Sequence, residues 1–311
     1  MAATHLRVAD LFSGCGGLSI GFDMQGIDTV VAMDHWRHAV DTYNHNAARG
    51  LVSGESVQHD LSDVESTVGL VRQYGPVDGI IGGPPCQDFS TAGKKQEGDR
   101  ASLTAAYAKI VAEVQPKFFV MENVARSLTS NAYKQAVEIL EAAGYFVGAA
   151  VVDASKVGAP QRRKRAFTVG TKDESATARI IESLTSGQTH DEVSVGEYIS
   201  SVTGQAMDTD HYYLIPTNYK RRGIFSTSEP APTMRGINRP IPPSYKGHPS
   251  NSADASKARP LTTKERSLVQ TFPLDYEFVS SKTANEQMIG NAVPPLLASY
   301  VAQAVKSEML D

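Results

Sequence analysis

The strongest fold signal in this chain is the stretch Asp78-Gly-Ile-Ile-Gly-Gly-Pro-Pro-Cys-Gln-Asp-Phe-Ser90. Its short apolar run is typical of a buried strand that the following glycines and prolines end. Each proline fixes its own φ and keeps the preceding residue out of a helix, so Cys86 follows on a stiff, extended segment. Ligands and chemistry collect at the carboxyl ends of strands in an open α/β sheet. The pattern therefore predicts a nucleophilic thiol, with a buried structural cysteine as the alternative.

Length and composition limit the class of protein. The chain has 311 residues, which predicts two domains, and it has only two cysteines, Cys15 and Cys86. So few cysteines argue against a disulfide scaffold and against a zinc site, and they favour a reducing, cytoplasmic setting. We see no signal peptide and no run of apolar residues that could span a membrane, and we expect no metal.

Charge is unevenly distributed along the chain. The net charge is −4, yet residues 156–172 carry six basic side chains and no acid. Residues 217–246 carry another six against a lone Glu229. Basic segments in an acidic protein predict one face that binds a polyanion, although an ordinary solvated surface is the alternative for either segment alone.

The first ninety residues outline a nucleoside pocket. Residues 6–12 read as a strand, followed by the glycine turn Ser13-Gly-Cys-Gly-Gly17 and a helical pattern. This arrangement opens a dinucleotide-type fold, but the spacing departs from the NAD fingerprint. The next two strand-like segments end near Asp34 and Asp60, and a carboxylate at such an end grips ribose hydroxyls.

The middle of the chain continues the same alternation. We predict a mobile loop over residues 89–100, a helix over 102–114, a strand ending near Glu122, a helix over 132–143 and a strand over 145–153. In residues 157–170, strand alternation places Gln161, Arg163 and Arg165 on one face and Arg162 and Lys164 on the other.

The last part changes in composition. From about 171 to 258 helical periodicity fades while proline, serine and glycine accumulate, which predicts a smaller, irregular domain of strands and loops. A capped helix over 262–270, a turn over 290–295 and a final helix over 296–309 follow.

Taken together, these motifs resemble those of the C5-cytosine DNA methyltransferase family. The glycine turn at 10–17 is similar to the family's first motif, and Pro85-Cys-Gln87 to its nucleophile motif. Glu122-Asn-Val124 and Gln161-x-Arg-x-Arg165 are similar to its glutamate and arginine motifs. Residues 259–273 and Gly290-Asn-Ala-Val-Pro294 resemble its last two, so only about 171–258 lies outside the match.

The resemblance implies a fold and an activity. The fold is α/β, a Rossmann-like sheet for S-adenosylmethionine-dependent methyl transfer with a smaller, irregular target-recognition domain. The implied catalytic domain is 1–170 plus 280–311, and the implied target-recognition domain is 171–279. The implied activity is methylation of C5 of cytosine in a specific double-stranded DNA site, by a monomer of bacterial or phage restriction-modification type. A tRNA cytosine methyltransferase and an inactive DNA-binding regulator remain as alternatives.

The resemblance also assigns residues. As a thiolate, Cys86 would add to C6 of a cytosine turned out of the duplex, and C5 would then take the methyl group. Glu122 would meet N3 and the exocyclic amine, Arg163 would bind O2, and Arg165 would hold the constellation. Asp34 replaces the family's usual glutamate, and whether His35 or Trp36 covers the adenine stays open. The expected cofactor contacts are Phe12, Gly14, Gly16, Leu18, Asp34, His35, Asp60, Leu61, Pro85, Leu103, Asn291, Ala292 and Val293. The expected DNA contacts are Gln87, Ser90, Gln161, Arg221, Arg222, Arg235 and Arg239.

Overall fold

A seven-stranded sheet forms the large part of the molecule in the computed structural model, which describes residues 5–85, 101–218 and 221–310. The strand order is β3-β2-β1-β4-β5-β8-β6. The five strands from β3 to β5 are parallel, whereas β8 runs antiparallel to both of its neighbours. The strands are β1 (Leu6–Leu11), β2 (Ile27–Asp34), β3 (Glu55–Gln58), β4 (Gly79–Gly82), β5 (Phe118–Val124), β6 (Phe146–Asp153) and β8 (Lys164–Thr171).

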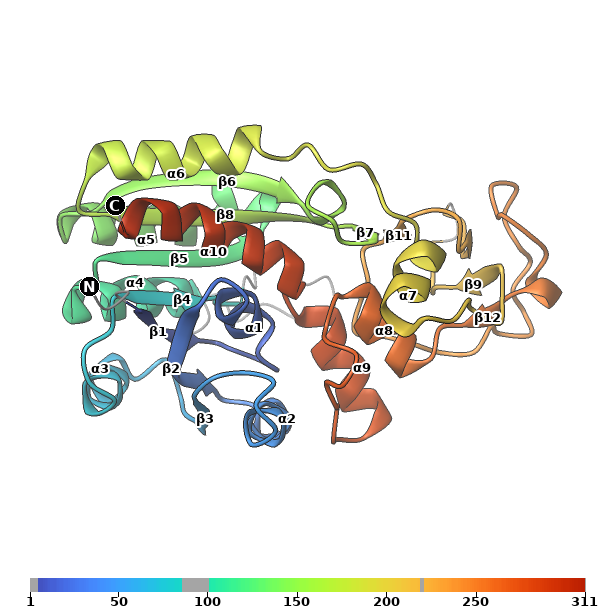
Figure 1. Cartoon of the computed structure of the whole chain (residues 1–311), viewed down its shortest axis with the longest axis horizontal. Helices are drawn as coiled ribbons and strands as arrows, with labels where there is room; N and C mark the ends of the chain where they lie inside the picture. The colour runs from blue at the N-terminus through green and yellow to red at the C-terminus, as the bar shows by residue number, and fades with distance from the viewer. Residues whose placement is uncertain (1–4, 86–100, 219–220, 311) are drawn as a thin grey trace.

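Helices cover both faces of this sheet, as Figure 1 shows. One apolar cluster joins the sheet to α1 (Gly17–Asp23), α6 (Glu174–Ser186) and α10 (Pro295–Met309). A second cluster joins it to α3 (Val64–Gln73), α4 (Ala101–Val114) and α5 (Asn131–Ala142). Along β5, Phe118 and Val120 belong to the first cluster and Phe119 and Met121 to the second, because successive strand side chains point to opposite faces. The predicted α/β fold is confirmed.

A smaller part lies beyond one end of the sheet (Figure 1). Its three-stranded sheet has the order β10-β9-β12, and β11 pairs with β7. Its own apolar cluster includes Val195, Tyr212 and Met234. The remaining elements are α2 (Arg37–Ala47), η1 (Ala125–Thr129), η2 (Ala154–Lys156), β7 (Gln161–Arg162), α7 (Val195–Thr203), β9 (His211–Tyr213), β10 (Ile224–Ser226), β11 (Ala231–Pro232), η3 (Ala255–Lys257), β12 (Arg259–Pro260), α8 (Thr263–Val269) and α9 (Lys282–Asn291).

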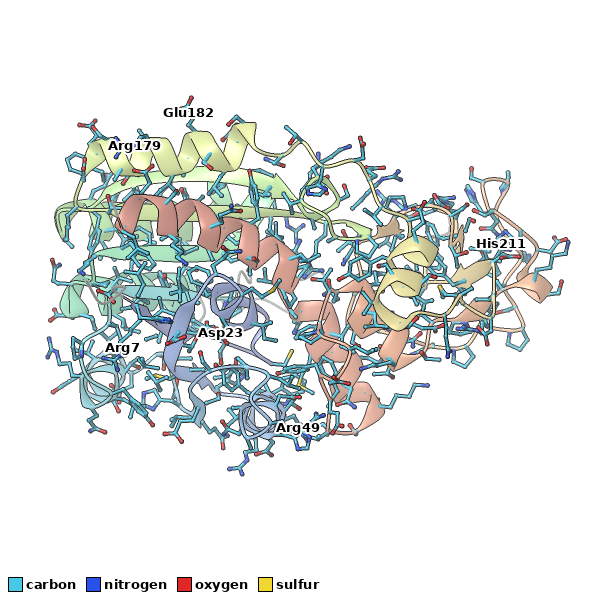
Figure 2. All side chains as sticks on the ribbon, viewed as in Figure 1. Arg7, Asp23, Arg49, Arg179, Glu182 and His211 are labelled. Carbon is cyan, nitrogen blue, oxygen red and sulfur yellow. The ribbon has the colours of Figure 1, made fainter. Side chains whose placement is uncertain are left out.

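The irregular segment begins later than the sequence predicts. Residues 174–186 form helix α6, which buries Ile180 and Leu184 against the large sheet. Arg179 of this helix pairs with Glu308 of α10 at 2.7 Å, and Glu182 lies on its outer side (Figure 2). Ala176, Ile180 and Leu184 recur every four residues along α6, so the helix is amphipathic and packs this face on the sheet. The proline, serine and glycine content of 171–258 as a whole outweighs this short pattern in the sequence. Nowhere in the described residues does a helix have the length and apolar character needed to cross a membrane.

Candidate active site

Three adjacent strands end side by side at the site. Leu11 of β1, Gly82 of β4 and Met121 of β5 lie in register across the sheet. A Cβ on Gly82 would lie 2.2 Å from the carbonyl oxygen of Leu11, so β4 can approach β1 this closely only with glycine at that position. The segments that follow these strands therefore meet at one edge of the sheet, as expected for parallel strands.

A cavity of about 380 Å³ opens at this edge. Its walls come from the three strand ends, from the start of α1, from β8 and from the C-terminal segment around residues 288–293. It brings together residues that the sequence predicts for catalysis and for cofactor binding. These are Phe12, Gly14, Leu18, Asp34, His35, Pro85, Leu103, Glu122, Arg163, Arg165, Asn291, Ala292 and Val293.

Glu122 and Arg165 form an ion pair in this cavity, with 2.9 Å between Oε1 and Nε. Burial raises the pKa of Glu122, while the neighbouring Arg165 and Arg163 guanidinium groups act in the opposite direction. The site thus holds a carboxyl group whose proton is retained to higher pH than in water. Such a group can donate to, or accept from, a polar ring in the cavity.

Asn123 orients the segment that leads to the cysteine. Its side-chain amide donates to the carbonyl oxygen of Pro84 at 3.0 Å, and its own Oδ1 accepts from the backbone N–H of Val124. Pro84 and Pro85 both line the cavity, so this described segment ends in the cavity wall. Cys86 itself, and with it Gln87 and Ser90, lies outside the described residues.

Arg163 lies deeper than Arg165 and has different partners. Its side chain is 1% exposed, and its guanidinium donates to the carbonyl oxygens of Met234, Gly290 and Ala292 at 3.0, 3.1 and 3.0 Å. Burial, with the nearby Arg165 charge, lowers its pKa well below the usual range. Among the described residues its Nε has no hydrogen-bond partner. The alternation predicted for β7 and β8 is confirmed here, since Gln161 and Arg163 are buried and Arg162 and Lys164 are exposed.

The other half of the cavity surrounds the Asp34 carboxylate. Its two oxygens accept from the backbone N–H groups of Gly14 at 2.9 Å and of Trp36 at 2.8 Å. Gly14 has a φ of +54°, and no atom lies within 4 Å of where its Cβ would stand. Phe12 has a φ of 60°, a left-handed conformation that is uncommon for a bulky residue and frequent at functional sites.

Comparison with known families decides the identity. The family model for C-5 cytosine-specific DNA methylases matches residues 6–307, which is nearly the whole chain. The chain belongs to the C-5 cytosine-specific DNA methylase family. Its activity is therefore that of a DNA cytosine-5 methyltransferase, a family whose methyl donor is S-adenosylmethionine.

Relatives of this methylase are Type II methyltransferases. M.HgiDI of Herpetosiphon aurantiacus is 46% identical over 305 residues, covering 97% of this chain and 94% of that protein. M.HindV of Haemophilus influenzae is 42% identical over 306 residues, covering 96% of each. A crystal structure from an E. coli prophage, described as a DNA modification methyltransferase, shares the fold with a TM-score of 0.72 at 24% identity. It covers 98% of this chain and 100% of its own.

Three predicted cofactor contacts of the methylase lie outside the cavity. Asp60 is exposed, and its Oδ1 accepts from the backbone N–H and the hydroxyl of Ser62. Leu61 is buried in the apolar cluster with α3, and Gly16 is the residue before α1, with a φ of +85°. Conversely, the cavity includes Gly83, Asn123 and Met288, which the sequence analysis did not assign to cofactor binding or catalysis. Gly83 and Asn123 lie within motifs that the sequence marks, whereas no local pattern marks Met288, which only the fold brings to the strand ends.

The predicted DNA contacts divide in the same way. Gln161 is fully buried, donates to Gln270 and accepts from the backbone N–H of Met234, so we do not propose a DNA contact for it. A second cavity of about 550 Å³ lies in the smaller part, and we call it the arginine hollow. Its wall contains no acidic side chain among the described residues, and its arginines are Arg162, Arg221, Arg222, Arg235 and Arg266. Arg239 is exposed but does not line it.

In the residues that the structure describes, there is no group of three or more histidine, cysteine or acidic side chains that could hold a metal ion.

Proposed function

We propose that this enzyme methylates a flipped-out cytosine in double-stranded DNA through a covalent bond between Cys86 Sγ and C6 of the ring. The observation that carries the proposal is the Glu122–Arg165 pair in a cavity that is also lined by Pro85, the residue before Cys86 in the sequence. A thiolate that adds to C6 makes C5 nucleophilic, and expulsion of the thiolate after loss of the C5 proton restores the aromatic ring.

Glu122 and Arg165 are suited to contact the ring. A carboxyl group whose pKa is raised by burial can share a proton with N3, and it can accept from the exocyclic amine. Arg165 bonds Glu122 through Nε and the carbonyl oxygen of Lys164 through Nη1, so its Nη2 can donate to O2. The geometry favours Arg165 over Arg163 for that contact, because both terminal nitrogens of Arg163 already donate to backbone carbonyls.

The other half of the cavity fits S-adenosylmethionine. Open space over Gly14, the Asp34 carboxylate and the neighbouring Trp36 ring suit an adenosyl group, which has ribose hydroxyls and a flat base. We propose that Asp34 accepts from the ribose and that Phe12 and the backbone of 290–293 enclose the rest. When bound there, the cofactor supplies the electrophilic methyl group.

The arginine hollow supports duplex DNA as the partner, and we propose that the part of 171–279 that follows α6 recognises the target. Exposed Arg221 and Arg235 line the hollow, and Arg235 is our candidate for reading a base in the major groove. Alanine at a base-reading arginine should cost roughly 1–3 kcal/mol and relax preference at one base pair.

The test of the proposed function uses Cys86→Ala. Bisulfite sequencing of a plasmid carried by cells that express the parent protein should reveal one methylated target site, and the variant should leave every cytosine unmethylated. The variant should still bind a duplex with that site. A duplex with 5-fluorocytosine at the target, which blocks proton removal, should trap a covalent complex with the parent only. If the 5-fluorocytosine duplex traps no complex although the parent protein methylates that target sequence, the role of Cys86 is contradicted.

A further inference from the structure

Two segments that lie far apart in the chain meet through their backbones. We call residues 234–239 the recognition run and residues 290–293 the cofactor wall. A Cβ on Gly290 would lie 2.1 Å from the backbone nitrogen of Gly236 and 2.3 Å from the carbonyl carbon of Arg235. The two segments can touch in this way only because position 290 is glycine.

One buried side chain bonds to both segments. Arg163 donates through Nη1 to Met234 in the recognition run and through Nη2 to Gly290 and Ala292 in the cofactor wall. The guanidinium is planar and its donors are fixed in direction, so it sets the position of one segment against the other. None of these three bonds involves a carboxylate.

A second polar chain runs parallel to the first. The backbone N–H of Met234 donates to Gln161 at 2.7 Å, and Gln161 donates to Gln270 at 2.6 Å. Gln270 in turn donates to the carbonyl oxygen of Ala292 at 3.2 Å. Both glutamine side chains are buried, so breaking any link leaves an unpaired polar group, which costs about 1–3 kcal/mol.

Each segment lines a different cavity. Arg235 and Ile237 of the recognition run line the arginine hollow. Gly290, Asn291, Ala292 and Val293 line the cavity that includes Asp34 and Glu122. A ligand that fixes one segment therefore acts on the other through Arg163 and through the glycine contact.

We propose that Arg163 is a positioning residue that joins the recognition run to the cofactor wall, so that target DNA and S-adenosylmethionine strengthen each other's binding. This inference rests on the proposed function, which assigns the two cavities to these ligands. By linkage, the factor by which the cofactor tightens DNA binding equals the factor by which DNA tightens cofactor binding. Loss of a merely structural residue would weaken both affinities without changing that factor.

The test compares two variants of the full chain with a matched control. Arg163→Lys keeps the charge but lacks the planar fork. Gly236→Ala places a Cβ 2.7–2.9 Å from the amide of Gln287, a flexible end that donates to Asn291 of the cofactor wall. Gly69→Ala is the control, because no atom lies within 4 Å of its added Cβ.

Fluorescence anisotropy would give the dissociation constant of an unmethylated duplex that contains the target sequence found by bisulfite sequencing. It is measured with and without S-adenosylhomocysteine as an unreactive probe. We expect a tightening of at least about 5-fold in the parent and in Gly69→Ala, the lower end of usual couplings. We call the dissociation constant without S-adenosylhomocysteine divided by that with it the coupling ratio. In Arg163→Lys and Gly236→Ala the coupling ratio should fall toward 1. Bisulfite sequencing of each variant tests the proposed function separately.

Two results would overturn the inference while methylation by the parent stays intact. One is a coupling ratio of 1 in the parent protein. The other is a coupling ratio in Gly236→Ala that equals the ratio in the parent. If Arg163→Lys does not fold, as judged by circular dichroism, Gly236→Ala decides the matter alone. If no cytosine is methylated by the parent protein, the proposed function fails instead.

Discussion

Two carboxyl groups near the site are buried, and they differ in the partners that replace water. Glu122 has Arg165 at 2.9 Å, whereas Asp10 in β1 has no ion-pair partner among the described residues and accepts from the hydroxyl of Ser19 at 2.7 Å. A hydroxyl stabilises a carboxylate far less than a guanidinium does. Burial accordingly raises the pKa of Asp10 to about 7, and its Oδ1 has no partner among the described residues. Asp10 is therefore a group that titrates near neutral pH beneath the glycine turn.

Asp10→Asn should change how stability depends on pH. The folded state of the parent keeps the Asp10 proton up to about pH 7, whereas the unfolded chain loses it near 3.8. The free energy of unfolding that this group contributes is complete below about pH 4 and is lost as pH rises through 7, by about 1.4 kcal/mol per pH unit. Urea midpoints between pH 5 and 8 should fall less steeply for the variant. Ser19→Ala, which keeps the carboxyl group, is the control, and equal slopes in the parent and Asp10→Asn would contradict the expectation.

Glu122→Gln should lower turnover more than DNA binding. The amide keeps the shape of the side chain but cannot supply a proton, and such groups contribute roughly 100-fold or more. Single-turnover rates at saturating DNA should fall by about that factor, while the dissociation constant changes little. Exposed Glu141 in α5 offers the matched control, Glu141→Gln. A rise in the Michaelis constant for DNA with unchanged turnover would remove Glu122 from the chemistry.

Residue identities at the site were predictable where a short motif carries them. The cavity contains Glu122, Arg163 and Arg165, as the sequence predicts. The partners of Arg163 were not predictable, because Met234 and Gly290 lie 71 and 127 positions away in the chain. The sequence indicates that a guanidinium is present, and only the fold determines whether it faces a ligand or a carbonyl.

At the scale of elements, α1 packs against the C-terminal part of the chain through two glycines. A Cβ on Gly17 would lie 2.2 Å from the carbonyl oxygen of Val293, and one on Gly21 would lie 2.3 Å from the Cβ of Ala298. Gly17 thus faces the cofactor wall, whereas Gly21 faces α10 one turn later.

Gly17→Ala and Gly21→Ala should therefore both lower stability, but they should differ in their effect on cofactor binding. Both overpack the interface and should lower the free energy of unfolding by about 1–3 kcal/mol. Only Gly17→Ala should also raise the Michaelis constant for S-adenosylmethionine, because it displaces Val293 of the cavity wall. Thermal unfolding and initial rates at varied cofactor would separate the two effects. An equal rise in both variants would show that the cavity responds to general loosening.

A helix whose start carries a capping motif could be predicted from the sequence. The capped helix after Thr262 is confirmed, since Thr262 and Glu265 form a capping box at the start of α8. Helix α6 was missed although Ala176, Ile180 and Leu184 recur at helical spacing, because the proline, serine and glycine content of 171–258 as a whole outweighs this short pattern.

On the scale of the whole molecule, the net charge is −4, yet arginines gather around the arginine hollow. Within the arginine hollow the guanidinium groups are not equivalent. Arg222 donates to Glu229 at 2.6 Å and to Ser252, and it lies 4.4 Å from the Phe225 ring centre. Arg221 is exposed at the rim.

Arg221→Ala should flatten the salt dependence of DNA binding, whereas Arg222→Ala should mainly lower stability. Each phosphate contact contributes about 0.9 to the slope of log affinity against log salt. Binding titrations at several salt concentrations should show that loss for Arg221→Ala. Thermal unfolding should show a lower midpoint for Arg222→Ala, because Glu229 loses its partner. A full change of slope in Arg222→Ala would place that residue on the DNA instead.

The cavity draws one wall from residues 12–36 and another from 288–293. During synthesis on a ribosome, the first wall emerges long before the second, and the small part is made in between. The apolar side chains of β1 and α1 therefore stay without their cover until α10, which packs on them, has left the ribosome. A nascent chain therefore has no complete cofactor pocket until residues 288–293 have been made and have packed against the first wall. A protein truncated before residue 288 should accordingly not retain S-adenosylmethionine on equilibrium dialysis.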